Sequence, residues 1–373
     1  MVRYLKRIIR WIYWIGYGFP LQVYSLLGNK QLYTADSYYP ELERKPKFSI
    51  LIDQIQHIWK FHIPEEYYFL YGLDIKNFRN KNEFLDYGLL MRQRDYLNAH
   101  AFGYENYSYT GILRDKFYFS AFMEQFGFEV PRTYGLIDNG RLYSSDKKGV
   151  IPLEAILGWD CDLVVKPLNG IGGVGIFRLK VTGGNLYLNG EQSTLEEFSK
   201  LTCSERFLLQ ERIREQHPLM DSLYRKSINT LRITTVRDFK TNTIHVLGCM
   251  LLMGARDAMV SNWHYGGVII NVDLQGNLDK YGYSLYEKKI TSHPETKIVF
   301  EDFKVPLFDK ALNQAIEAHK MFYGLHSIGW DFAILKDKVV FIEGNDDWGM
   351  AAHQMVSGGI VPFFDKYFYL PKR

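Results

Sequence analysis

The spacing of apolar residues along the chain predicts a mixture of helices and strands. Helices are predicted over 50–60, 82–98 and 308–323, and over 113–126, where Gly127 follows as a helix end. Strands are predicted where β-branched and aromatic residues cluster between turn signals, at 162–167, 176–181, 206–213, 230–237, 244–253, 267–273, 328–335 and 338–344. Because these elements mix without regular βαβ alternation, the pattern favours an α+β fold over a doubly wound parallel sheet.

The first 28 residues have a different pattern, that of a basic amphipathic helix. One helical face carries the basic residues Arg3, Lys6, Arg7 and Arg10, and the opposite face carries Leu5, Ile8, Ile9 and Ile12. Glycine, proline and glutamine interrupt the apolar run after residue 15, so it is too short to span a bilayer. Tryptophans and tyrosines in the run, and the lack of a small-residue cleavage site, argue against a secretory signal. Two interpretations remain, a helix in a membrane interface and a helix docked on the protein's own core.

Composition narrows the class of protein. The 373 residues suggest two or three domains, and 47% hydrophobic, 16% aromatic and 23% charged residues exclude disorder and a disulfide-stapled mini-protein. A net charge of +3 argues against a nucleic-acid partner. Cys161, Cys203 and Cys249 lie far apart, in no metal-binding spacing, and this sparse, odd count predicts a reducing, cytoplasmic compartment.

A glycine-rich loop between two predicted strands is the first candidate for chemistry. Its glycines are Gly170, Gly172, Gly173 and Gly175. A Rossmann or Walker loop would lead into a helix, whereas here a strand follows at Ile176. The pattern therefore predicts a flap that covers phosphates, with Lys166 on the preceding strand able to reach a phosphate. An ordinary glycine-rich hairpin is the alternative.

Two acids and an amide near the C-terminus are the second candidate. Glu343 and Asn345 are two residues apart on one predicted strand and so share a face. With a three-residue hairpin loop at 336–338, Asp331 lies opposite Glu343, whereas a two-residue loop would place it on the other face. These oxygen ligands in an apolar sheet suit Mg²⁺, since unpaired buried carboxylates are costly. Edge-strand acids that face solvent are the alternative.

Taken in chain order, these pieces resemble the ATP-grasp superfamily. The resemblance rests on Lys116, the Val165-Lys166-Pro167 strand with its glycine loop, Leu209–Ile213, Arg232 in Asn229-Thr230-Leu231-Arg232, and Asp331 with Glu343-Gly344-Asn345. Gly266-Gly267 and Gly329-Trp330-Asp331 make the chain most similar to the sugar-transfer-associated branch. The similarity extends over roughly residues 105–360.

The resemblance implies an ATP-grasp fold, in which two α+β subdomains hold ATP, here preceded by a mainly helical N-terminal segment. The implied domains are a helix at 1–28, a helical region at 29–104, an N-terminal subdomain at 105–205 and a C-terminal subdomain at 206–373. The implied ATP-binding residues are Lys116, Lys166, Gly170, Gly172, Gly173, Gly175, Gln210, Glu211, Ile213 and His217. Residues 210–213 would pair with adenine through the backbone, and His217 stands where many members place a glutamate for the ribose.

The resemblance also implies the remaining roles. Asp331, Glu343 and Asn345 would hold one or two Mg²⁺ ions, and Arg232 would brace the transferring phosphoryl group. The implied substrate-side residues are Asn229, Arg256, Gly266 and Gly267. Arg256 is the candidate to replace an arginine that the branch carries where this chain has Leu252.

The implied activity is an ADP-forming ligase that joins a carboxylate to an amine through an acyl phosphate. The substrates implied are small molecules, such as an amino acid and a sugar acid, in surface polysaccharide or glycoconjugate modification, with no nucleic-acid partner. The expected location is cytoplasmic, with peripheral membrane contact through residues 1–28. The alternatives are an ATP-grasp kinase that phosphorylates a hydroxyl of a sugar-like substrate and a non-catalytic nucleotide-binding protein.

Overall fold

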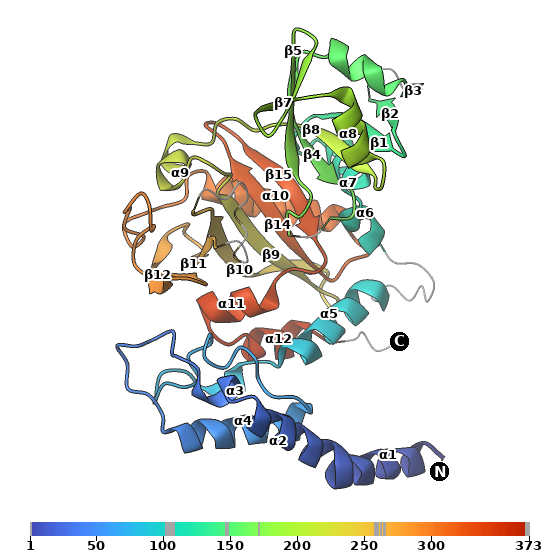
Figure 1. The fold of residues 1–373 in the computed structure, drawn as a ribbon. Helices are drawn as coiled ribbons and strands as arrows, with labels where there is room; N and C mark the ends of the chain where they lie inside the picture. The colour runs from blue at the N-terminus through green and yellow to red at the C-terminus, as the bar shows by residue number, and fades with distance from the viewer. Residues whose placement is uncertain are drawn as a thin grey trace. The chain divides into compact units, whose positions relative to one another are not determined.

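The computed structural model describes residues 2–100, 109–145, 149–170, 172–256, 261, 263 and 266–369. The chain divides into two compact units (Figure 1). The first contains the chain up to Gln93 together with Gly349–Phe368, and the second contains Arg94–Trp348 and the chain from Tyr369. Residues 349–368, placed in the C-terminal subdomain by the sequence analysis, thus group with the N-terminal region. The boundary expected between 104 and 105 lies outside the described residues.

The first unit is helical, as the sequence predicts. Its elements are α1 (Val2–Tyr13), a π-helical turn (Trp14–Gly18), α2 (Phe19–Gly28), α3 (Gln31–Thr34), α4 (Lys47–Phe61), a 3₁₀ turn (Lys81–Glu83), the start of α5 (Tyr87–His100), α11 (Met350–Ser357) and α12 (Val361–Tyr367). Helix α4 forms because Ile50, Gln54 and Ile58 recur every four residues and bury one face. The Gln54 amide donates to the carbonyls of Leu32 at 2.8 Å and Glu65 at 3.0 Å. This buried amide ties three segments of the unit together.

The second unit begins with helices that flank a residue important for the site. The sequence predicts one helix over 113–126, whereas the structure has α6 (Thr110–Arg114) and α7 (Lys116–Gln125). The break arises because Asp115 caps α7, its Oδ1 accepting from the N–H groups of Phe117 at 3.0 Å and Tyr118 at 3.1 Å. Lys116 consequently occupies the first position of α7.

Two antiparallel sheets make up most of the second unit, among the residues that the structure describes. The first has the order β3-β2-β1-β8-β4-β5-β6-β7. Its strands are β1 (Thr133–Asp138), β2 (Arg141–Ser144), β3 (Gly149–Ile151), β4 (Cys161–Pro167), β5 (Phe177–Thr182), β6 (Asn185–Leu188), β7 (Glu191–Ser193) and β8 (Phe207–Glu211). A 3₁₀ helix (Leu153–Gly158) and α8 (Leu195–Thr202) accompany it. Its core includes Leu163, Val165, Leu179, Phe198 and Leu209.

The second sheet has the order β13-β12-β11-β10-β9-β14-β15. Its strands are β9 (Thr230–Asp238), β10 (Thr243–Met253), β11 (Val268–Val272), β12 (Leu278–Ser284), β13 (Lys288–Ile290), β14 (Ser327–Ile334) and β15 (Val339–Asn345). Helix α9 (Pro218–Leu223) precedes it, and α10 (Phe308–Met321) packs against β9, β10 and β14. Every residue of β14 is buried, as expected of a strand covered on both faces. Among the described residues, no helix combines the length and hydrophobicity needed to cross a membrane.

A candidate nucleotide and metal site

Three neighbouring strands of the second sheet carry a row of charged side chains. Asp331 on β14 lies opposite Arg232 on β9 and, on its other side, opposite Glu343 on β15. Asn345 follows two residues after Glu343, and its Nδ2 lies 3.3 Å from Glu343 Oε1 and 3.5 Å from Asp331 Oδ2. The predicted gathering of Asp331, Glu343 and Asn345 on one face is confirmed.

The route to this register differs from the one predicted. The N–H of Leu335 donates to the carbonyl of Lys338 at 2.8 Å, so the hairpin loop has two residues, the alternative that by itself would place Asp331 on the other face. Near the turn, the strands pair in a register that would place Ile342 opposite Asp331. An irregularity after Asp331 shifts the register by one residue and brings Glu343 into place. Such a β-bulge re-aims a side chain without changing the rest of the hairpin.

Arg232 and Asp331 form a buried bidentate ion pair. The Nε of Arg232 donates to Oδ1 of Asp331 and its Nη2 to Oδ2, each at 2.6 Å. Burial raises the pKa of Asp331, Arg232 opposes that rise, and the adjacent Glu343 carboxylate adds to it, so the net shift is upward. Two carboxylates side by side in a buried sheet repel each other unless cations lie against them. Arg232 is one such cation.

Glu343 is the point where cations from several elements converge. Burial raises the pKa of Glu343, but Lys116 on α7, Arg232 on β9 and Lys166 on β4 outweigh burial, so its pKa is lowered. Two ammonium groups and one guanidinium thus act on a single carboxylate. Such groups also bind the oxygens of an anionic ligand.

The glycine loop joins β4 and β5 as a strand–loop–strand unit, which confirms that part of the prediction. The two strands pair antiparallel, with Val165 opposite Phe177. Gly172, Gly173 and Gly175 have φ values of 68°, 83° and 74°. These left-handed conformations require glycine, since a β-carbon would be strained there.

Lys116 is attached to this loop. Its Nζ donates to the carbonyl of Gly170 at 2.7 Å and lies 3.5 Å from that of Leu168. Burial lowers the pKa of Lys116. The predicted phosphate ligand thus holds the glycine loop beside the charged row.

Lys166 is held by a chain of buried polar groups. Its Nζ donates to Oε1 of Gln210 at 3.0 Å, and Nε2 of Gln210 donates to Oγ of Ser120 at 2.9 Å. Lys166 and Gln210 lie diagonally across the β4–β8 pair, on the same face. Burial lowers the pKa of Lys166 to about 8. The resemblance implied a role for the Gln210 backbone, whereas the structure gives its side chain a role in positioning Lys166.

The predicted adenine-binding segment follows the end of β8. Glu211 still belongs to the sheet, because its N–H donates to the carbonyl of Arg132 at 2.8 Å. Among the described residues, no hydrogen bond uses the N–H or the C=O of Ile213. His217 caps α9, its Nδ1 accepting from the N–H of Leu219 at 3.2 Å. The backbone N–H and C=O of Ile213 could therefore pair with a ligand. The Nε2 of His217 lies on the side of the ring away from the bond that caps α9.

The four substrate-side candidates have structural partners of their own. Asn229 is fully buried, and its Nδ2 donates to the carbonyls of Met220 and Tyr224 at 2.7 Å each. Arg256 donates to Glu287 and lies over the ring of Tyr286 at 4.4 Å. A β-carbon on Gly266 would lie 2.6 Å from the same ring. Gly266 and Gly267 are buried just before β11. Among the described residues, the structure thus ties Asn229 to α9 and Arg256 to the loop after β12.

Two acidic residues missed by the sequence analysis extend the row. Arg114 donates to Asp346, with Nη2 and Oδ2 2.7 Å apart, and buried Arg94 lies 2.5 Å from Asp347. Asp347 also acts on Arg232, whose pKa it helps to raise against the effect of burial. The signal was available, because both acids directly follow Asn345, although their partners come from distant segments.

The glycine loop and the acid row both lie within the residues that a family comparison matches. The profile of the sugar-transfer associated ATP-grasp family matches residues 98–363, well over half of the chain. The chain belongs to this family. No curated protein matches the chain in sequence.

Several solved structures are similar to part of the chain at low sequence identity. Staphylococcus aureus N5-carboxyaminoimidazole synthetase with ADP is 13% identical (TM-score 0.42), covering 72% of this chain and 57% of its own. Campylobacter jejuni biotin carboxylase is 12% identical (TM-score 0.43), covering 70% and 48%. Helicobacter pylori D-alanine-D-alanine ligase is 13% identical (TM-score 0.39), covering 70% and 60%. The chain thus spans about half the length of the structures that it resembles.

The acid row fits a magnesium ion. Asp331 and Glu343 supply carboxylate oxygens, and Asn345 adds an amide whose oxygen can face the same point after rotation about its last bond. The donor set therefore suits a hard cation. Both oxygens of Asp331 contact Arg232, so Asp331 must share or release that partner to bind the ion.

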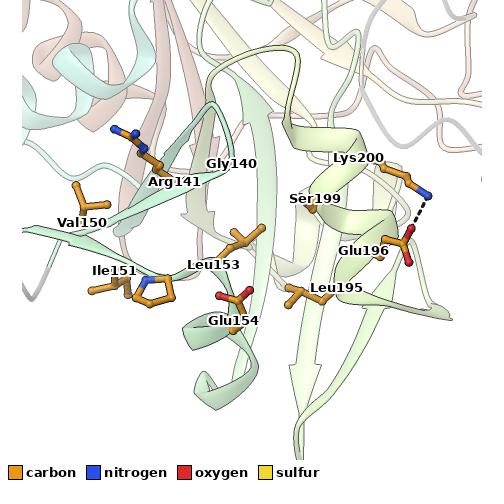
Figure 2. A pocket seen from close by; sticks show the side chains of 11 residues that line it. Gly140, Arg141, Val150, Ile151, Leu153, Glu154, Leu195, Glu196, Ser199 and Lys200 are labelled. Carbon is orange, nitrogen blue, oxygen red and sulfur yellow. Dashed lines mark ion pairs between the residues drawn. The ribbon is translucent and has the colours of Figure 1, made fainter.

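A cavity of about 760 Å³ lies elsewhere in the second unit, beside the first sheet (Figure 2). It is lined by residues of the β2–β3 region, the 3₁₀ helix and α8, among them Arg141, Glu154 and Lys200. Lys200 pairs with Glu196, one helical turn away, at 2.7 Å. None of the predicted site residues lines this cavity.

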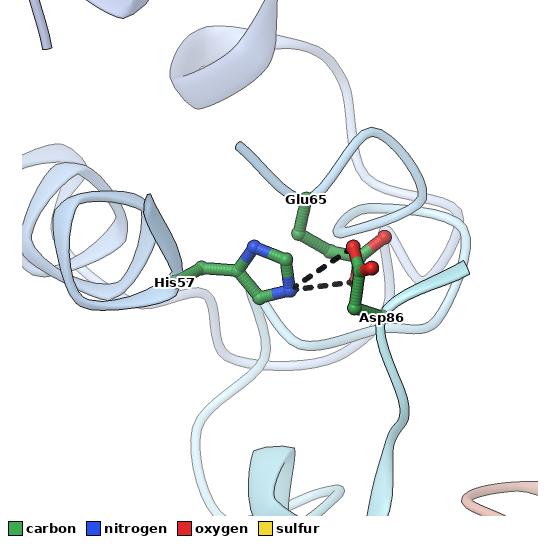
Figure 3. Close-up of side chains that lie close together, drawn as sticks. All are labelled: His57, Glu65 and Asp86. Atoms are coloured by element: carbon green, nitrogen blue, oxygen red, sulfur yellow. Dashed lines mark ion pairs between the residues drawn. The ribbon is translucent and has the colours of Figure 1, made fainter. Parts of the chain in front are cut away.

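A second buried group of titratable side chains lies in the first unit (Figure 3). One ligand atom each from His57, Glu65 and Asp86 lies within 4.8 Å of the others, close enough for one metal ion. However, His57 Nδ1 lies 2.9 Å from the carbonyl of Ile63, and Nε2 lies 3.2 Å from Glu65 and 4.0 Å from Asp86. Burial lowers the pKa of His57, but Glu65 outweighs burial and the pKa is raised. The raised pKa favours the protonated ring, which can donate from both nitrogens, and we therefore interpret the group as an ion pair.

Proposed function

We propose that the chain is an ATP-dependent, ADP-forming ligase that joins a carboxylate to an amine. The observation that supports this most is the convergence of Lys116, Lys166 and Arg232 on Glu343, beside which Asp331 is paired with Arg232. Three cations beside two metal-type carboxylates match the needs of Mg²⁺ and a polyphosphate. Phosphoryl transfer depends on positioning and charge neutralisation, so a site of this kind needs no protein nucleophile.

We assign the nucleotide to the space beside the glycine loop. Lys166, oriented by Gln210, and Lys116 would bind the phosphates. The backbone of Ile213 would pair with the adenine edge, and the Nε2 of His217 would meet the ribose. Asp331, Glu343 and Asn345 would hold one or two Mg²⁺ ions, which would neutralise phosphate charge.

Arg232 acts on the group that is transferred. Its guanidinium binds an anion through two parallel hydrogen bonds, and a phosphoryl group is an equivalent bidentate partner. The substrate carboxylate attacks the γ-phosphorus, the bond to the bridging oxygen breaks, and ADP leaves. The amine then attacks the acyl carbon of the acyl phosphate, which forms the amide and releases phosphate, and the amine loses a proton. Arg232 stabilises the charge that develops on the phosphoryl oxygens.

The substrate class that we propose comes from the family description. A sugar-transfer association suggests that the carboxylate or the amine belongs to a sugar-containing molecule, such as a sugar acid joined to an amino acid. Modification of surface polysaccharides or glycoconjugates on the cytoplasmic side is the setting that this chemistry suggests.

The test is ATP turnover with pairs of carboxylates and amines, followed by mass analysis of the products. The ligase is supported if ADP and phosphate appear together with an amide, and if the amide requires both partners. A phosphorylated product without free phosphate would identify a kinase instead. ATP binding without turnover across the whole panel would support the non-catalytic alternative.

A further inference from the structure

We propose that α1 and α2 form a surface that binds anionic lipid membranes. This inference concerns the first unit alone and is independent of the chemistry proposed for the second. The helices α1 and α2, with the π-helical turn between them, form one helical run over residues 2–28 (Figure 1). The residues at both ends of the π-helical turn keep right-handed helical backbone angles, so the run is not broken there.

The apolar face of α1 does not pack on the protein. Leu5, Ile9 and Ile12 are 58%, 57% and 61% exposed. Within the described part of residues 2–28, Leu26 is the one fully buried side chain. The interpretation that this helix docks on the protein's own core is therefore not supported by the contacts of α1. Contiguous apolar surface of this kind marks an interaction site.

The second half of the run fixes the surface to the folded unit. Helix α2 packs against α4, where the rings of Phe19 and Trp59 meet edge-on at 5.2 Å. The ring of Trp14 lies 3.9 Å from that of His62. The attachment leaves Tyr17, Leu21, Tyr24 and Leu27 exposed, which extends the apolar surface from α1 along α2.

The basic residues near the start of the chain indicate which kind of partner binds this surface. The first 35 residues contain five basic residues and no acidic residue. Lys6 and Arg10 are exposed on the helical face opposite Leu5, Ile9 and Ile12, and Arg3 and Arg7, whose side chains lie outside the described ones, follow the same periodicity. A second copy of this helix would bring like charges together, whereas anionic headgroups complement them. A basic face beside an apolar one is the pattern of a helix that lies in a membrane interface.

Aromatic residues mark the borders between the two faces. At 3.6 residues per turn, Trp11 and Tyr13 fall on opposite sides of the apolar stripe, between it and the basic face. They are 61% and 62% exposed. Tryptophan and tyrosine prefer headgroup depth, because one end of each ring system is apolar and the other forms hydrogen bonds.

The experiment is flotation of the full chain with vesicles of phosphatidylcholine alone or with added phosphatidylglycerol. We expect flotation with the anionic vesicles, loss of binding as salt rises, and none with phosphatidylcholine alone. The variant Leu5→Gln/Ile9→Gln/Ile12→Gln should lower partitioning about tenfold or more, and so should Lys6→Glu/Arg10→Glu. The melting temperature of each variant shows whether the protein remains folded.

Matched controls change equally exposed residues of the second unit. Leu201→Gln/Leu274→Gln/Leu285→Gln and Lys180→Glu/Lys280→Glu should bind vesicles like the unaltered protein. Unchanged flotation of the α1 variants would overturn the proposal, as would equal binding to neutral vesicles. If the unaltered chain fails to float and is a dimer that the α1 variants convert to a monomer, the surface binds a second copy instead.

Discussion

The two units each bury a cluster of charged side chains, and the clusters differ in how completely their own neighbours satisfy them. In the first unit, His57 has an acceptor on each ring nitrogen, the Ile63 carbonyl and the Glu65 carboxylate. In the second, Asp331 and Glu343 lie side by side on neighbouring strands, and cations from three further elements act on Glu343. Adjacent carboxylates with lysines beside them suit a metal ion and phosphates, whereas the ring nitrogens of His57 have their partners within the first unit.

The largest expected effect comes from removing the Glu343 carboxylate in the second unit. Glu343→Gln should lower Mg²⁺-dependent ATP turnover by about 10³-fold or more, because the ion loses a charged ligand. Turnover at saturating ATP measures this, and circular dichroism checks that the fold persists. Glu301→Gln, an exposed glutamate, is the control. Turnover that survives Glu343→Gln would remove this residue from the metal site.

Arg232→Ala should reduce kcat/KM about 10²- to 10³-fold, which is the usual cost of losing one group that stabilises transition-state charge. ATP affinity, measured by calorimetry, should change little. Arg232→Lys keeps the charge but loses the bidentate geometry, and should recover only part of the rate. If ATP affinity falls as much as kcat/KM, Arg232 binds the ground state and its proposed role is wrong.

A smaller effect should appear in the pH dependence of ATP binding. Because the pKa of Lys166 is about 8 without ligand, this lysine loses its proton as pH rises through 8. Phosphates favour the charged form, so ATP binding should take up a proton above pH 8 and weaken several-fold by pH 9. Calorimetry in two buffers of different ionisation enthalpy measures this uptake. Lys166→Arg, which stays charged, should abolish it; uptake that persists in that variant would assign the proton to another group.

The smallest effect is expected in the first unit. The pKa of His57 is raised in the folded state, so its contribution to stability is complete below the unfolded pKa of about 6.5 and is lost as pH rises through the folded value. The variant His57→Gln should therefore cost about 1 kcal/mol at pH 6 and less at pH 9, by denaturant unfolding. Zn²⁺ or Mn²⁺ should leave the unfolding midpoint of the unaltered protein unchanged. A metal-dependent rise would contradict the assignment of an ion pair.

The sequence alone determined the elements whose signal is local. The strand–glycine loop–strand unit was readable because glycines and β-branched residues are neighbours along the chain, and β4 and β5 lie where they were expected. Lys166, Asp331 and Glu343 were singled out from such local patterns. Lys116 and Arg232 rested on the family resemblance instead. Short strands such as β6, β7 and β13 were missed, because they carry too few residues for a periodic pattern.

The tertiary structure decided everything that depends on register or on distant partners. Asp331 meets Glu343 because a bulge compensates for a two-residue loop, and no local pattern reveals a bulge. Gln210 orients Lys166 through a diagonal contact between strands that are 44 residues apart in sequence. Residues 349–368 group with the N-terminal unit for a similar reason, since their partners lie far away along the chain. The periodicity of the sequence determines on which face of a strand or helix a side chain lies. Only the packing of distant segments determines which residues it contacts on that face.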